Sequence, residues 1–309
     1  MERRDLLSLA ALAVGSSRLT HASAKASSEV RPSGLPRRPV IQAADGTRLH
    51  YEDWGSGPTI VFIAPWALDS GWWEYEIAAL MGQGVRCVAL DRRGHGRSDP
   101  TSRGLDFDTL ADDIAAAMTQ LDLRDVTLVG HSMGCADIVR FVTRHHAARV
   151  KRIVLVATIT PFLLKTPDNP VGVDTAVLDR GRSALAKDRP HQIAISADTF
   201  FGAPKNAVSQ EVKDWWTRMM VDRCSLMTML ELHRVFTTTD FRPELPRIGV
   251  PTLLIHGDAD ASAPLEMTSR RTAALIPGSE LKIYENAAHG LPVTHAERLS
   301  ADLLAYVKS

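Results

Sequence analysis

Short, largely apolar runs recur along the chain and alternate with stretches of helical periodicity. The runs cover residues 59–64, 85–90, 126–129, 153–157, 252–255 and 281–284. A run that is apolar at nearly every position suits a strand buried on both faces of a sheet. Strands that alternate with helices favour a mostly parallel sheet with helices on both faces. We therefore expect an α/β fold for most of the chain.

Local signals predict several element boundaries. Residues 40–42 and 49–51 flank Asp45-Gly46, a pair typical of a hairpin turn between two strands. Asp106 or Asp108 could cap a helix whose apolar face carries Leu110, Ile114, Met118 and Leu121. Residues 294–297 read Thr-His-Ala-Glu, the form of a capping box, which predicts a last helix from this point to about Val307.

The segment 161–242 interrupts the alternation, because it has no clear strand signal. Its helical patterns carry several large apolar side chains, namely Trp215, Trp216, Met219, Met220, Met227 and Met229. We expect a helical cap at 161–242, inserted into a core formed by residues 39–160 and 243–309. Most of these side chains should form the core of the cap, with one or two facing a substrate, since pockets are lined mainly by apolar groups.

The N-terminal residues have the features of an export signal. Arg3 and Arg4 precede an apolar stretch at 6–14, and residues 22–24 form a small-residue cleavage site. This predicts a signal peptide at 1–24 that resembles a twin-arginine signal, followed by a flexible leader at 25–38. The apolar stretch is too short to span a bilayer, which needs about 20 residues. We expect a periplasmic or secreted protein; the alternative is a cytoplasmic one with an unstructured tail.

Charge and cysteine content exclude several classes of partner. The 36 lysine and arginine residues are balanced by 36 aspartate and glutamate residues, so we expect neither nucleic acid nor an anionic membrane as a partner. The cysteines Cys87, Cys135 and Cys224 fit neither a disulfide framework nor a zinc site. Cys87 lies in an apolar run and is expected in the core, whereas Cys135 lies close to the motif described next.

The strongest chemical signal is Gly-His-Ser-Met-Gly at residues 130–134, directly after an apolar run and before a helical stretch. A G-x-S-x-G motif between a strand and a helix is a nucleophile elbow, a sharp turn that projects the serine Oγ above the sheet. Glycines on both sides let the backbone turn tightly, and the helix N-terminus adds free N–H groups and positive potential. Ser132 is therefore the predicted nucleophile.

A serine nucleophile needs a base, and chains with this elbow place an acid and then a histidine after the serine. His289 follows the run at 281–284 and a short polar loop, which places it at the carboxyl edge of a parallel sheet, where sites form. The other histidines after Ser132 are expected on the helix after the elbow, in the cap, at the end of a strand or at the start of the last helix; they are His145, His146, His191, His233, His256 and His295.

Two acids follow the run at 252–255, and the residues alone leave the choice between Asp258 and Asp260 open. Either carboxylate could approach Nδ1 of His289, where it would hold the tautomer and stabilise the imidazolium. The tetrahedral oxyanion needs two backbone N–H groups, one from Met133 and one from the loop after the run at 59–64, which we expect to be that of Trp66.

At these residues the chain resembles the α/β-hydrolase superfamily, through the elbow, residues 91–99 and residues 257–264. It is most similar to the cofactor-free (non-haem) haloperoxidase and perhydrolase-like esterase group, through residues 162–170, 239–241 and 289–297. The similarity runs from about residue 42 to the C-terminus. The resemblance implies the α/β-hydrolase fold and no metal, haem or other cofactor. It also implies a catalytic triad of Ser132, Asp260 and His289, with Asp260 as the acid, and an oxyanion hole from Trp66 and Met133.

Two departures from this group bear on activity. The group usually has His-Gly before the oxyanion residue and Pro after it, whereas here Ala64-Pro65 precede Trp66 and Ala67 follows. This weakens the expectation of perhydrolysis more than that of hydrolysis. The group's glycine-rich stretch after the elbow is Cys-Ala-Asp at 135–137, whose larger side chains would narrow the pocket or alter helix packing.

We therefore expect a serine hydrolase that cleaves carboxylic esters or lactones through an acyl-enzyme at Ser132. Its expected partner is a small-molecule ester, lactone or acid. One alternative is a haloperoxidase/perhydrolase that forms peracids from short carboxylic acids and hydrogen peroxide, and another is hydrolysis of a carbon–carbon bond in a diketone. A third, a non-catalytic ligand-binding protein on the same fold, is disfavoured because the serine, histidine and aspartate are all present.

Overall fold

The structure, a computed structural model, describes residues 39–147 and 149–309. The predicted signal peptide at 1–24 and the leader at 25–38 lie outside the described residues. The described residues all belong to one compact unit. No helix among the described residues has the length and apolar character needed to cross a bilayer.

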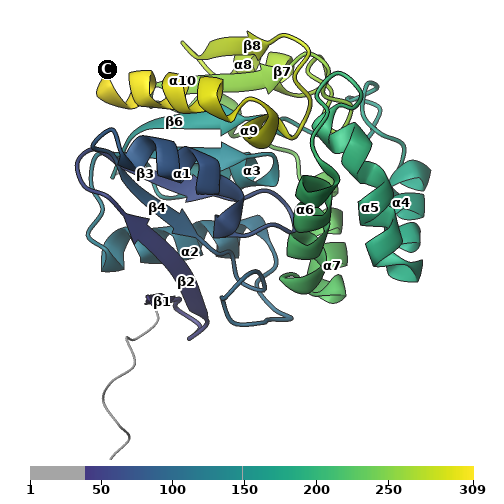
Figure 1. The fold of residues 1–309 in the computed structure, drawn as a ribbon, viewed down its shortest axis with the longest axis horizontal. Helices are drawn as coiled ribbons and strands as arrows, with labels where there is room; N and C mark the ends of the chain where they lie inside the picture. Colours follow the sequence, from purple (N-terminus) through teal and green to yellow (C-terminus); the bar gives the residue numbers. More distant parts are fainter. Residues whose placement is uncertain (1–38, 148) are drawn as a thin grey trace, which may run out of the picture. The chain divides into compact units, whose positions relative to one another are not determined.

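An eight-stranded sheet forms the centre of this unit, with the strand order β1-β2-β4-β3-β5-β6-β7-β8 (Figure 1). β1 and β2 pair antiparallel, as do β2 and β4, and every other neighbouring pair is parallel. The strands are β1 (Val40–Gln42), β2 (Arg48–Trp54), β3 (Thr59–Ile63), β4 (Arg86–Leu90), β5 (Val126–His131), β6 (Val150–Val156), β7 (Thr252–Gly257) and β8 (Glu280–Tyr284). The predicted hairpin and the six predicted runs are thus confirmed as strands. Burial on both faces is wrong for the run at 281–284, because β8 is an edge strand in which Tyr284 alone is buried.

Helices cover both faces of the sheet, because successive residues of each central strand point to opposite sides. In β3, Val61 and Ile63 join the hydrophobic core beneath α2 (Phe107–Gln120) and α3 (Met133–Arg144). Ile60 and Phe62 join the core beneath α1 (Glu74–Met81) and α10 (Ala296–Lys308) on the other side (Figure 1). The remaining core helices are η1 (Ser70–Trp73), η2 (Leu245–Arg247), α8 (Ser269–Leu275) and α9 (Leu291–Thr294).

The structure decides between the two predicted caps of α2 and corrects the predicted start of the last helix. Asp106, not Asp108, caps α2: its side chain accepts a hydrogen bond from the Thr109 N–H at 2.9 Å. The capping box predicted at 294–297 is wrong, since Thr294 is the last residue of α9 and α10 begins at Ala296 without a side-chain cap. The Thr294 hydroxyl instead lies 2.8 Å from Nδ1 of His295 and is therefore occupied.

Residues 161–242, between β6 and β7, contribute helices but no strand to the sheet. The helices are α4 (Thr175–Lys187), α5 (Arg189–Phe201), α6 (Gln210–Asp222) and α7 (Leu226–Thr238), which lie together at one end of the sheet (Figure 1). As expected, most of the large apolar side chains here are buried, including Trp216, Met219 and Met229, whereas Met227 is exposed.

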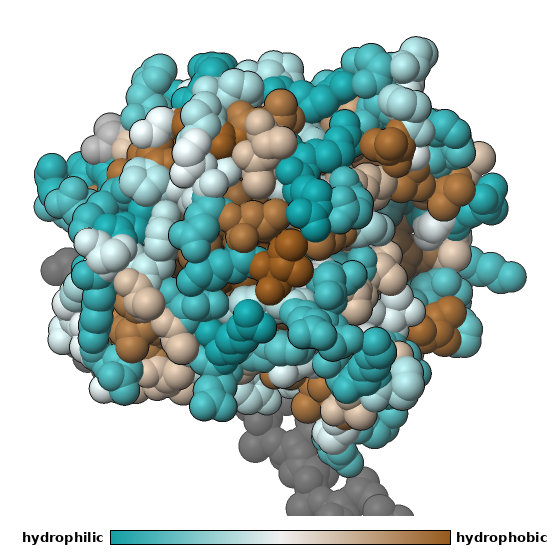
Figure 2. Space-filling view, turned by 90° about the horizontal axis from the view of Figure 1, so that it is seen from above, coloured by the Kyte–Doolittle hydropathy of each residue, from teal (hydrophilic) through white to brown (hydrophobic). Residues whose placement is uncertain are grey.

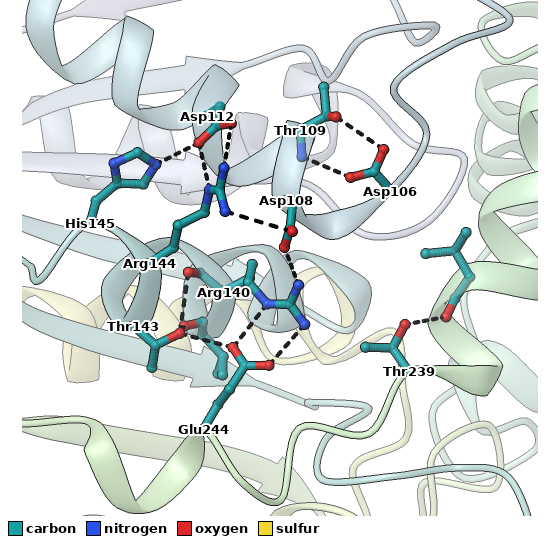
Figure 3. A network of polar contacts seen from close by, with 12 residues as sticks. Asp106, Asp108, Thr109, Asp112, Arg140, Thr143, Arg144, His145, Thr239 and Glu244 are labelled. Atoms are coloured by element: carbon teal, nitrogen blue, oxygen red, sulfur yellow. Dashed lines mark hydrogen bonds and ion pairs between the residues drawn. The ribbon is translucent and has the colours of Figure 1, made fainter.

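The chain returning from α7 is attached to the core by a polar network (Figure 3). Arg140 of α3 donates to both oxygens of Glu244, at 2.9 and 2.8 Å, and also pairs with Asp108 of α2. α3 ends at Arg144, so His145 and His146 follow this helix rather than lie on it, and His145 contacts Asp112 at 2.8 Å.

β8 forms the edge of the sheet opposite to β1. The face seen from above the view of Figure 1 mixes hydrophilic side chains with hydrophobic groups, one of them near its centre (Figure 2). Ile283 of β8, 37% exposed, is one of the larger apolar side chains that reach solvent. β3, β4, β5, β6, β7 and β8 all run parallel, so their carboxyl ends share one edge of the sheet.

Candidate active site

Ser132 occupies a strained turn between β5 and α3. Its backbone has φ 54° and ψ −117°, a region that non-glycine residues rarely adopt. Its N–H donates to the Val156 carbonyl at 2.9 Å, and its own carbonyl accepts from the Cys135 N–H at 3.1 Å. The surrounding hydrogen bonds therefore hold a conformation that points the side chain away from the sheet.

The glycines of the motif are required by close backbone approach. A Cβ at Gly130 would lie 2.6 Å from the Gly134 carbonyl carbon, and a Cβ at Gly134 would lie 2.4 Å from the Ile63 carbonyl oxygen. Real Cβ atoms do not come this close to backbone atoms. Gly130 is thus required because the end of β5 packs against the start of α3, and Gly134 is required because α3 packs against the end of β3.

Three predicted side chains meet at the carboxyl edge of the sheet. Nε2 of His289 lies 2.9 Å from Oγ of Ser132, and Nδ1 of His289 lies 2.7 Å from Oδ2 of Asp260. They come from the turn after β5, the loop after β7 and the loop after β8. All three residues are buried, with 7%, 5% and 4% of Ser132, His289 and Asp260 exposed.

The carboxylate of Asp260 is fixed on both oxygens. Oδ1 accepts from the backbone N–H groups of Ser262 and Ala263, each at 2.8 Å. Oδ2 faces His289 and also lies 3.2 Å from Nε2 of His256. Burial alone would raise the pKa of Asp260, but the two adjacent imidazole rings outweigh it and hold the pKa below its usual value. The group is therefore an anion at neutral pH.

Asp258, the competing acid, has a different place. It is exposed, and its Oδ1 accepts from the Asn286 N–H at 2.6 Å, which braces the turn beside β8. The geometry thus separates two carboxylates that the residues alone left as alternatives. His256, expected at the end of a strand, lies in β7 and contacts Asp260, a role that its i, i+4 spacing from this acid could have suggested.

His131 holds the loop that carries His289, a role that the sequence did not indicate. The Trp72 indole N–H donates to Nδ1 of His131 at 3.0 Å, so the ring proton is on Nε2, which donates to the His289 carbonyl at 2.9 Å. Burial, with the neighbouring His289, lowers the pKa of His131 well below its ordinary value, so this ring stays neutral. The ring is fully buried, and its plane is nearly parallel to that of Trp72, at 11°.

Trp66 and Met133 both line the space next to Ser132. Trp66 lies in the turn after β3, and Met133 is the first residue of α3. Arg92 supports the turn, because its guanidinium donates to the carbonyls of Ala64 at 2.8 Å and Pro65 at 3.3 Å. The same guanidinium forms a buried ion pair with Asp137 of α3, which links the Trp66 turn to the helix that follows the serine.

The structure shows where the residues that depart from the haloperoxidase group lie: Ala67 is in the turn after β3, and Cys135 and Asp137 are in α3. Ala67 has φ 60°, which a proline could not adopt because its ring fixes φ near −65°. Cys135 and Asp137 do not line the cavity at Ser132, so of the two expected effects a narrower pocket is wrong, while both side chains are buried in the packing of α3. Cys135 packs beneath the turn with Sγ 3.2 Å from the Gly130 carbonyl oxygen, and burial raises the pKa of its thiol.

A cavity of about 420 Å³ opens beside Ser132 and His289. Its walls come from the core and from the helical segment, and they are mainly apolar. The large apolar side chains are Trp66, Leu68, Met133, Ile159, Leu163, Leu178, Leu185, Ile193, Phe200, Trp216, Met220, Phe236 and Met267. Trp216 and Met220 are thus the members of the expected apolar set that face the cavity. Within residues 39–147 and 149–309, no cluster of three or more His, Cys, Asp or Glu residues could hold a metal ion.

Residues 58–296 match the model of the alpha/beta hydrolase fold family, and the chain belongs to this family. It is 39% identical over 274 residues to a non-heme chloroperoxidase of Kitasatospora aureofaciens, covering 87% of this chain and 99% of that protein. It is 34% identical over 279 residues to a bifunctional esterase/perhydrolase of Acinetobacter calcoaceticus, with coverage of 87% and 99%.

Solved structures show the same relationship. An esterase from Exiguobacterium antarcticum superposes with a TM-score of 0.84 at 30% identity, covering 88% of this chain and 100% of that one. A bromoperoxidase from Bacillus anthracis superposes with a TM-score of 0.83 at 32% identity, covering 87% and 99%. These similarities confirm the predicted fold and the predicted resemblance to the non-haem haloperoxidase group.

Proposed function

We propose that this chain is a serine hydrolase that cleaves carboxylic esters or lactones through an acyl-enzyme on Ser132. The observation that carries the proposal is the hydrogen-bonded chain Ser132–His289–Asp260, which lies at the wall of an apolar cavity. The names of the esterase and esterase/perhydrolase relatives support the same chemistry.

The proposed reaction uses His289 as the proton carrier. Nε2 takes the proton of Ser132 as Oγ attacks the ester carbonyl, and the resulting imidazolium is stabilised by Asp260. When the tetrahedral intermediate collapses, Nε2 gives the proton to the leaving alkoxide, and an alcohol departs. A water molecule then attacks the acyl group by the same route, which releases the acid and restores Ser132.

We propose that the oxyanion of each tetrahedral intermediate binds the backbone N–H groups of Trp66 and Met133. Met133 is at the N-terminus of α3, where N–H groups are free and the helix dipole is positive. The hydrogen bonds from Arg92 to the carbonyls of Ala64 and Pro65 support a fixed position for the Trp66 N–H. Loss of one such donor typically lowers the rate by about 10²–10³-fold.

Perhydrolysis is the second candidate, favoured by the chloroperoxidase and esterase/perhydrolase relatives. In this reaction hydrogen peroxide replaces water in the second step, and the acyl group leaves as a peracid that oxidises halide in solution. Ala67, whose φ of 60° no proline can adopt, gives this chain a turn unlike the proline-containing one of the haloperoxidase group. We therefore propose hydrolysis as the main activity.

Substitution Ser132→Ala tests the proposal. We expect turnover of p-nitrophenyl acetate to fall at least about 10⁴-fold, because the nucleophile is removed. Ser102→Ala, at an exposed serine outside the site, is the matched control and should keep wild-type turnover. Labelling of the wild type but not of Ser132→Ala by a fluorophosphonate would identify the nucleophile. Wild-type turnover by Ser132→Ala would refute the assignment.

Dye bromination in acetate, bromide and hydrogen peroxide separates the two candidates. Peracid formation that depends on Ser132 would establish perhydrolysis, whereas ester turnover without bromination would leave hydrolysis alone.

A further inference from the structure

The polar groups on the cavity wall differ in whether they already have partners. The Ser196 hydroxyl donates to the Ile193 carbonyl at 2.7 Å, and the Thr237 hydroxyl donates to the His233 carbonyl at 2.7 Å. Thr199 and Ser262 are exposed residues that water can satisfy. His233 of α7 and Gln192 of α5 are different, because both are half-buried and, among residues 39–147 and 149–309, neither Nε2 of His233 nor the Gln192 amide has a hydrogen-bond partner. Of the two, the His233 ring is held in place by its neighbours.

The tautomer of His233 is set by Arg182 of α4. A guanidinium nitrogen of Arg182 lies 3.3 Å from Nδ1 of His233. A guanidinium carries donors only, so Nδ1 must accept and the ring proton is on Nε2. Burial, with the nearby positive charge of Arg182, lowers the pKa of His233 to about 4, so the ring is neutral at pH 7.

Aromatic neighbours hold this ring next to the proposed oxyanion turn. The Trp66 ring contacts it edge to face with centroids 5.6 Å apart, and Phe236 contacts it at 5.0 Å. Trp66 is fixed in turn, since its indole N–H donates to the Met229 carbonyl at 2.9 Å. The Nε2–H group of His233 is therefore a donor held in a fixed position on a largely apolar cavity wall, where it can bind an acceptor atom of a molecule in the cavity.

We propose that Nε2–H of His233 binds a second oxygen of the substrate, so that the cavity selects neutral esters or lactones carrying a carbonyl, ether or hydroxyl oxygen several bonds from the cleaved bond. This inference rests on the proposed hydrolase function and adds its substrate class. None of the residues that line the cavity is Asp, Glu, Lys or Arg, so no charged side chain there pairs with an ionic substrate. A neutral donor in such a wall recognises an acceptor without demanding a charge.

A position scan of oxygen in the substrate tests the proposal. The parent is p-nitrophenyl hexanoate, and in each relative one chain CH₂ is replaced by an ether oxygen; a second series places the oxygen in the alcohol chain. Each kcat/KM is divided by the hydroxide-catalysed rate of the same ester to remove intrinsic reactivity. We expect one oxygen position to be preferred over the parent, by about 3- to 10-fold for a single neutral hydrogen bond.

Substitutions then assign this preference to His233. His233→Phe keeps a ring of similar size and should abolish the preference, while His233→Gln, which retains an N–H donor, should restore part of it. Arg182→Met frees the ring to change tautomer and should weaken the preference, and Arg182→Lys should preserve it. Gln192→Leu removes the half-buried amide that lines the same cavity and should leave the preference in place.

The outcomes separate this inference from the proposed function. If the wild type cleaves no ester in a Ser132-dependent manner, the hydrolase function fails. If the wild type cleaves the parent ester but prefers no oxygen position, the hydrolase function stands and the role of His233 is overturned. The same holds if His233→Phe lowers kcat/KM by the same factor for the parent ester and for the preferred oxygen-containing ester. Loss of the preference in Gln192→Leu alone would assign the donor to Gln192 and likewise overturn it.

Discussion

Substitution Asp260→Asn should disable the site through the tautomer of His289 rather than through loss of shape. The backbone N–H groups of Ser262 and Ala263 donate to Oδ1, so the amide oxygen of asparagine must stay at that position. The amide NH₂ then replaces Oδ2, 2.7 Å from Nδ1 of His289. Because this NH₂ can only donate, it forces Nδ1 to accept and places the ring proton on Nε2.

A proton on Nε2 of His289 points at Ser132 and prevents the ring from acting as a base. The comparable change in a serine protease lowers kcat by about 10⁴-fold, which corresponds to about 5.5 kcal/mol of transition-state stabilisation. We expect a loss of the same order here, measured as kcat for p-nitrophenyl acetate, with circular dichroism to verify folding.

Asp258→Asn is the matched control for this experiment, because Asp258 is exposed and only braces the turn through the Asn286 N–H. It should change kcat by less than about threefold, as surface substitutions usually have small effects. A folded Asp260→Asn protein with kcat within tenfold of wild type would refute the reasoning, and a larger loss in Asp258→Asn would assign the acid to the other carboxylate.

Two further substitutions probe buried groups near the site. His131→Phe keeps a ring but removes the hydrogen-bond partner of the Trp72 N–H and of the His289 carbonyl, so the free energy of unfolding, measured by urea denaturation, should fall by about 2–6 kcal/mol. In steady-state kinetics, kcat should fall by a larger factor than KM rises. A change in KM alone would contradict a positioning role for His131. Burial raises the pKa of Glu76 well above its ordinary 4.5, so the folded state keeps a proton that the unfolded state releases, and stability should decline as pH rises above 4.5 through the folded pKa. The Glu76 oxygens have no hydrogen-bond partner within the part of the chain that the structure describes. Glu76→Gln should flatten this decline and raise the urea midpoint at pH 8; an unchanged pH slope would count against the burial argument.

The sheet and the meeting of Ser132 with His289 could be predicted because they depend on a coarse pattern. A continuous apolar run specifies a buried strand wherever it lies, and the carboxyl ends of parallel strands share one edge. Two residues that follow different strands of such a sheet are therefore neighbours despite their separation of 157 positions.

Choices over one or two residues could not be predicted from the sequence pattern. Asp258 and Asp260 follow the same strand, and the turn that folds Asp260 back onto its own backbone decides which one faces His289. The capping box failed for a similar reason, since residues 291–294 form a helical turn of their own. The hydrogen-bond partners of His131 lie 59 and 158 positions away, and no local signal marks such contacts.

The place where residues 161–242 leave and rejoin the sheet has a consequence for protein engineering. The Phe241 N–H donates to the Pro161 carbonyl at 2.9 Å, so the two ends of the inserted segment lie side by side, and residues 243–251 then lead to the start of β7. Because these ends are adjacent, a foreign helical segment could be joined there while β5, β7 and β8, which carry Ser132, Asp260 and His289, keep their pairing. The cavity wall could then be diversified in a library while the reactive groups stay constant, provided that the graft supplies an acceptor for the indole of Trp66.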